Sequence, residues 1–85
     1  MHEVELIEKL AELCHEQWSD WMKYLFSRCK VNFDGSVTIP EWAVTRWKNQ
    51  IITTYEDLSE NEKNSDRDEA RKFIKLLKEE GVLKI

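Results

Sequence analysis

The sequence is poor in residues that bend, loosen or cross-link a chain. Its 85 residues include only two glycines, one proline and two cysteines, and it has no glycine- or serine-rich linker. The 41% of hydrophobic and 35% of charged residues are typical of a folded globular protein rather than a disordered one. One small domain covering residues 1–85 is therefore expected, with limited capacity to bury a core.

Long apolar runs and an excess of positive charge are also missing. No apolar stretch approaches the roughly 20 residues that cross a bilayer, and the N-terminal MHEVELIEKL is too charged for a signal peptide. The net charge of −4 lacks the basic excess that nucleic-acid binding requires. We therefore expect a cytoplasmic protein that binds neither membranes nor nucleic acids.

The two cysteines, Cys14 and Cys29, fall in a single predicted helix. Fifteen residues of helix separate them by roughly 22 Å, too far for a disulfide bond. We predict that both are reduced and buried as small hydrophobic side chains.

Signatures of catalysis and of metal binding are absent. The sequence has no glycine-rich phosphate loop, no nucleophile elbow and no HExxH motif. The segment KVNFDGSVTIPEW places Gly35 at position 6 of a calcium-binding EF-hand loop. However, Lys30 replaces the carboxylate required at position 1, and the segment is better explained as a hairpin followed by a helix. We therefore expect no enzymatic activity, no catalytic residue, no metal and no cofactor.

The hydrophobic spacing predicts one long helix at the N-terminus. Apolar residues recur at steps of three and four over residues 3–29, with a possible break at Ser19-Asp20. This stripe consists of Val4, Ile7, Ala11, Cys14, Trp18, Met22, Leu25 and Cys29, and it is widened by Leu6, Leu10, Leu13 and Trp21.

A hairpin and two further helices follow. Asp34-Gly35 is a strong hairpin-turn dipeptide between two β-prone pieces. Capping boxes at residues 38–41 and 59–62 predict a helix over 41–52 and another ending at Glu80, before Gly81. The predicted fold class is mainly α, with three helices and one short β-hairpin between the first and second. The expected core stripes of the later helices are Trp42, Ala43, Trp47 and Ile51, and Ala70, Phe73, Ile74 and Leu77.

Aromatic residues are abundant for such a small core. The four tryptophans exceed what a domain of this size easily hides, so one or two are expected to line a groove where a flat ligand can stack. His15 lies one helical turn before Trp18, so the two side chains share a face. Arg67, between Asp66 and Asp68, is interpreted either as a salt-bridged surface residue or as a group directed at an anion.

Two stretches resemble the repeat domain first described in ryanodine receptors, which has small free-standing relatives in bacteria and their viruses. The family pattern LAE-x-x-HE-x-W is met by residues 10–18, and a second similar segment, residues 55–81, begins with a Tyr, a Leu and an EK-x-x-DR run over residues 55–67. The similar segments cover about 36 of the 85 residues. The middle differs, since Met22 stands where the family has an arginine and Thr54 where it has a proline.

The resemblance implies a site for an adenine-type nucleotide. In the family the motif tryptophan stacks on a ring system and an arginine lies near the phosphates. This implies Trp18 as the stacking platform, with His15 beside it and Arg67 as the anion contact. The candidate ligand-binding residues are His15, Trp18, Trp21, Tyr55, Asp66 and Arg67.

Two functions are therefore expected as alternatives. The first is a non-enzymatic domain that binds a nucleotide-like ligand in an aromatic groove between the first and third helices, to sense or sequester a signal. The second is a protein–protein interaction or homo-oligomerisation module that uses the long first helix. Its seam of Val4, Ile7, Ala11 and Cys14 extends beyond what a three-helix core covers.

Overall fold

The longest element, α1 (Glu3–Arg28), is one uninterrupted helix of 26 residues. The computed structural model describes residues 3–84 of the chain. Helical hydrogen bonding continues through Ser19 and Asp20, so the break considered there does not occur. Glu3 and Glu5 lie in the first turn and Arg28 in the last, and each charge interacts favourably with the helix dipole at that end.

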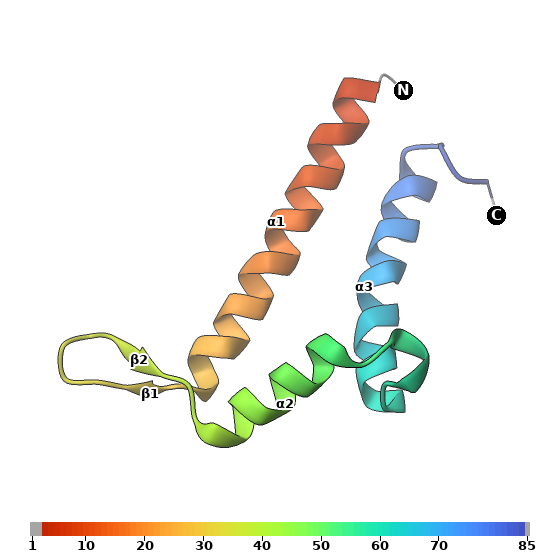
Figure 1. Ribbon diagram of the computed structural model, residues 1–85. Helices are drawn as coiled ribbons and strands as arrows, with labels where there is room; N and C mark the ends of the chain where they lie inside the picture. Colours follow the sequence, from red (N-terminus) through yellow and green to blue (C-terminus); the bar gives the residue numbers. More distant parts are fainter. Residues whose placement is uncertain (1–2, 85) are drawn as a thin grey trace.

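A two-stranded antiparallel hairpin follows α1, as predicted. Strands β1 (Lys30–Val31) and β2 (Val37–Thr38) pair Lys30 with Thr38 and Val31 with Val37. Gly35 supplies the positive φ of 87° that the turn needs, a conformation that costs glycine little. The hairpin projects away from the helices (Figure 1), and the Phe33 side chain near its tip is fully exposed.

Helix α2 (Glu41–Ile52) begins where the sequence predicts, but not by the predicted cap. Pro40 is the N-cap residue and makes no side-chain capping bond. The Thr38 hydroxyl instead donates to Asn32 Oδ1 at 3.2 Å, because Thr38 is part of the hairpin. The capping box predicted at residues 38–41 is therefore wrong.

A short 3-10 helix, η1 (Tyr55–Asp57), leads into α3 (Glu60–Glu79). Here the predicted cap is present, since Ser59 Oγ accepts the backbone N–H of Glu62 at 3.2 Å. At the other end Gly81 adopts a φ of 73°, and the Val82 N–H donates to the Leu77 carbonyl at 2.9 Å. Local signals thus determine both ends of α3.

The three helices form an open frame (Figure 1). Helices α1 and α3 run in opposite directions, and α2 joins them at one end while the chain termini lie at the other. An ion pair between Lys9 and Glu80 links the free ends of α1 and α3. The predicted fold class, mainly α with three helices and a hairpin between the first two, is confirmed.

The predicted core stripes of α2 and α3 are wrong in four of their eight positions, which are exposed. Within residues 3–84 the only buried side chain is Ala43. Trp47, Phe73 and Leu77 are half-buried, whereas Trp42, Ile51, Ala70 and Ile74 are exposed. Cys14 is exposed and Cys29 half-buried, both as free thiols, so their predicted burial is also wrong. The physical reason is that the rest of the described chain covers these faces only in part.

The chain consequently exposes far more surface than a compact domain. Its accessible area is 7076 Å², about 1,800 Å² more than the roughly 5,300 Å² expected for a compact monomer of 10.2 kDa. Its radius of gyration is 16.8 Å, against about 12 Å for a compact chain of this length. More apolar surface therefore remains in contact with water than in a compact domain of this mass.

Candidate functional site

Three of the predicted site residues lie on the exposed surface of α1. The rings of His15 and Trp18 stack with their centroids 6.2 Å apart and their planes inclined by 22°. The spacing of three residues places the two rings on adjacent turns of one face. Trp18 is 57% exposed and Trp21 52%, so the flat face that the sequence predicts is open to a binding partner.

Trp18 belongs to a longer apolar seam on α1. We define the α1 seam as the alternate three- and four-residue positions Val4, Ile7, Ala11, Cys14, Trp18 and Trp21. All six are exposed, including Val4 at 71% and Ile7 at 54%. This is the spacing of coiled-coil a and d positions, which a partner helix normally covers.

The opposite side of α1 faces α3. A hollow of about 480 Å³ between the two helices is lined by Lys9, Glu12, Leu13 and Glu16 of α1, by Lys72, Lys75, Leu76 and Glu79 of α3, and by Glu80, the C-cap residue of α3. On a helix of 100° per residue, these α1 positions lie about half a turn from the α1 seam. Contact with α3 therefore leaves the seam uncovered.

This hollow is not the expected aromatic groove. None of the side chains that line it is aromatic, and charged groups of both signs predominate. The pKa of Lys9 is raised, chiefly by its hydrogen bond to Glu80 at the C-terminal cap of α3. The pKa of Lys72 is also raised, chiefly because its ammonium donates to Glu69 Oε1 at 3.0 Å within α3. The ion pair of Lys9 with Glu80 joins the two helices, but a surface pair of this kind contributes little stability.

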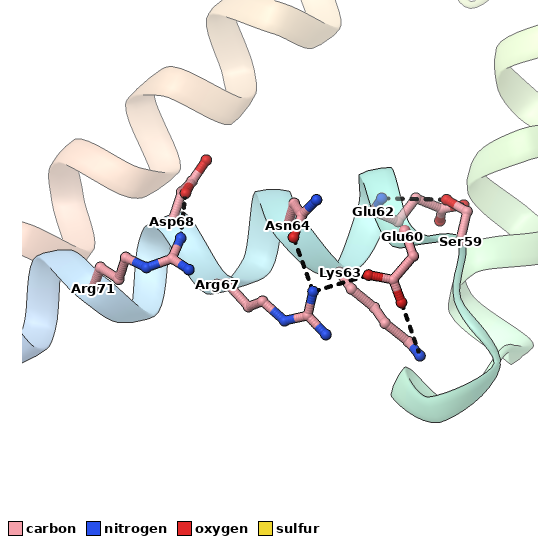
Figure 2. Close-up of polar contacts among 8 residues, drawn as sticks. All are labelled: Ser59, Glu60, Glu62, Lys63, Asn64, Arg67, Asp68 and Arg71. Atoms are coloured by element: carbon pink, nitrogen blue, oxygen red, sulfur yellow. Dashed lines mark hydrogen bonds and ion pairs between the residues drawn. The ribbon is translucent and has the colours of Figure 1, made fainter.

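The other predicted site residues lie around the beginning of α3. The Arg67 guanidinium donates to Glu60 Oε2 at 3.1 Å and to Asn64 Oδ1 at 2.8 Å (Figure 2). The pKa of Arg67 is raised, mainly by the bond to Glu60 and less by Tyr55. Asp66 is exposed and is not one of these acceptors. Arg67 is therefore a salt-bridged surface residue in this structure, the first of the two interpretations that the sequence allowed.

A second polar group connects α2 to α3. Gln50 Nε2 donates to Glu62 Oε2 at 2.6 Å, and the Ser59 hydroxyl donates to Glu62 Oε1 at 2.9 Å. Both bonds stabilise the carboxylate, and they lower the pKa of Glu62, with that from Gln50 contributing most. The cap of α3 and the junction with α2 therefore share one side chain, which orients the two helices.

The structure divides the predicted site residues into two groups. His15, Trp18 and Trp21 lie along α1, whereas Tyr55 and Arg67 lie together near the start of α3 with Lys63 5.8 Å from the Tyr55 ring centroid. Sequence reasoning missed which edge of α1 would contact α3. The available signal was the charge pattern, because Lys9 and Glu16 can complement the charges near the end of α3.

Neither a metal centre nor a membrane segment is found in the part of the chain that the structure describes. No cluster of three or more His, Cys, Asp or Glu side chains is arranged to hold a metal ion among residues 3–84. Within the same residues, no helix has both the length and the apolar character needed to cross a bilayer. Comparisons with protein-family models, with curated proteins and with solved structures gave no match.

Proposed function

We propose that this chain is a protein–protein interaction module whose outer α1 surface binds another helix. The observation that carries the proposal is the lack of an internal core, since Ala43 is the only buried side chain of residues 3–84. Folded domains persist because apolar burial offsets the conformational entropy lost on ordering the chain. A chain that covers so little apolar surface by itself gains its stability from a partner.

The α1 seam is the surface best suited to that partner. It is apolar, continuous over residues 4–21, and faces away from α3. Exposed apolar stripes of this kind mark interaction sites rather than ordinary surface. A helix laid along the seam would bury alternate side chains of α1, as in other helix-in-groove complexes.

Urea unfolding of dilute protein tests this function, with the mass measured in parallel by light scattering. A monomeric chain is expected to show a shallow, weakly cooperative transition, because little surface is available to be exposed on unfolding. A monomer that unfolds in a steep transition, with a stability of several kcal/mol, would contradict the proposal.

A second candidate function is the binding of a small nucleotide-like ligand by a ryanodine-receptor-type domain. It is favoured by the stacked, exposed pair of His15 and Trp18, which offers an aromatic face to a flat ring. Arg67 would have to exchange Glu60 for a phosphate, since Glu60 already accepts from its guanidinium. This function needs only one ring face and therefore less of α1 than the first proposal does.

Tryptophan fluorescence and thermal shift against adenine mono- and triphosphates, ADP-ribose and cyclic nucleotides test the second candidate. A saturable quench with a raised melting temperature is expected for one ligand class. Trp18→Ala should remove this response, and Trp42→Ala, which changes a similarly exposed tryptophan on α2, should retain it. No response across the panel from folded protein would reject the ligand function and leave the interaction module.

A further inference from the structure

We propose that the partner of the α1 seam is a second copy of this chain, bound as an antiparallel pair of α1 helices. This inference rests on the proposed interaction function and adds the identity and orientation of the partner. It follows from three observations: the area left exposed, the sizes of the side chains along the seam, and the charges beside it.

The exposed area matches what a stable homodimer requires. Each chain exposes about 1,800 Å² more than a compact monomer of its mass, which corresponds to about 3,600 Å² for two chains. Obligate homodimers bury roughly 2,000–5,000 Å² in total, whereas transient contacts bury about 1,200 Å² or less. The excess is spread over the whole chain, so the α1 seam supplies part of this area, and a second copy is a partner that is always present.

The seam is complementary to itself when two copies run in opposite directions. With Ala11 opposite Cys14 of the second copy, Ile7 lies opposite Trp18 and Val4 opposite Trp21. With Val4, Ala11 and Trp18 as a positions and the other three seam residues as d positions, every a position contacts a d position of the second copy. The two-fold axis makes each of these contacts occur twice in the dimer. Each large indole faces a smaller aliphatic side chain, which is the pairing that fills a helix interface evenly.

A parallel pair would fit less well. It would place Trp18 against Trp18 and Trp21 against Trp21 at one end, and only Ala11 against Ala11 nearer the other. A pair of tryptophans needs a wider distance between the helix axes than a pair of alanines does. Two straight helices that pack roughly 8–10 Å apart cannot provide both distances. The antiparallel arrangement distributes the large and small residues symmetrically about its centre.

The flanking charges select the same orientation. In a parallel pair, Glu3 of one copy lies beside Glu8 of the other on both sides of the seam, so like charges repel. In the antiparallel pair, Glu8 lies beside His15 of the second copy, which can donate a hydrogen bond to the carboxylate. The helix dipoles also oppose each other in the antiparallel pair, an arrangement that favours association.

Light scattering and sedimentation over about 5–500 µM chain test the dimer, a range of two decades within which a micromolar association is resolved. The wild-type protein should have twice the chain mass of 10.2 kDa. Ile7→Glu should raise the dissociation constant by at least about 100-fold, because it buries a carboxylate in the interface. Ile51→Glu makes the same change at an 82% exposed position of α2 and should leave the mass unchanged.

Cysteine cross-linking tests the orientation without a disruptive substitution. In a Cys29→Ala background, Ala11→Cys should give a disulfide-linked dimer on mild oxidation, because residue 11 faces Cys14 of the second copy. The same background without Ala11→Cys should remain uncross-linked. Rapid cross-linking through Cys14 alone would indicate a parallel pair and overturn the proposed orientation.

The possible failures are distinguishable. A wild-type chain that stays monomeric and weakly cooperative even at the highest concentration would overturn self-association but leave a different protein as the partner. A monomer with a steep unfolding transition would overturn the interaction function as well. If Ile7→Glu loses its helical circular dichroism, the cross-linking of Ala11→Cys to Cys14, which keeps Ile7, decides the dimer instead.

Discussion

Replacing Trp18 by alanine measures how much of the α1 seam is covered by a partner. In the single chain Trp18 is 57% exposed, so about 140 Å² of the roughly 250 Å² of a tryptophan remains to be buried. If a second copy covers half of that area, each Trp18 contributes about 1.8 kcal/mol at about 25 cal/mol per Å². The two tryptophans of a dimer then contribute about 3.5 kcal/mol, so the substitution should raise the dissociation constant roughly 300-fold.

Trp42→Ala is the matched control for this measurement. Trp42 is 50% exposed, so both substitutions remove a similar amount of contact within the chain, but Trp42 lies on α2 outside the α1 seam. Sedimentation equilibrium over a dilution series gives the dissociation constant of each variant. Equal shifts for the two variants, or no shift for Trp18→Ala, would refute the assignment of the seam as an interface.

Three further predictions concern the local structure. Ser59→Ala should lower the free energy of unfolding by about 0.5–2 kcal/mol because it removes the α3 cap. Thr38→Ala should lower it by less, because Thr38 caps no helix. Equal losses of the two variants in urea unfolding would contradict this difference. The hydrogen-bonded carboxylate of Glu62 has a lowered pKa, so its stabilisation is present above the unfolded value of about 4.5 and is lost as the pH falls through the folded value. Glu62→Gln should therefore reduce the fall of the melting temperature below pH 4.5, and an unchanged acid profile would count against this role. Gly35→Ala should destabilise the hairpin by about 1 kcal/mol, as measured from its amide hydrogen exchange, because an alanine is strained at a φ of 87°; unchanged exchange would argue against the turn.

The elements of the fold could be predicted because their signals are local. The spacing of apolar residues predicted α1, the Asp34-Gly35 dipeptide predicted the hairpin, and Ser59 with Gly81 predicted both ends of α3. The capping box at Thr38 failed for a local reason too, because that hydroxyl has an alternative partner in Asn32. The capping-box motif spans only four residues, so it does not include Asn32, which lies six positions before Thr38.

The candidate site could be predicted only in part. The stacking of His15 on Trp18 follows from helical spacing, and the structure contains it. The expected groove between α1 and α3 required the aromatic edge of α1 to face α3, but the charged edge containing Lys9 and Glu16 faces α3 instead. Both edges carry apolar residues at helical spacing, so periodicity alone could not choose between them.

The sequence by itself determined approximately where the three α-helices and the hairpin turn lie, because capping, backbone preferences and apolar spacing act over only a few neighbouring residues. Only the tertiary structure decided which faces of those helices meet, because that choice depends on contacts between segments far apart in the chain. The same contacts decided that Val4, Ile7 and Trp18 remain exposed. Burial is a property of the whole arrangement rather than of any one helix, and here it leaves the α1 seam for a partner.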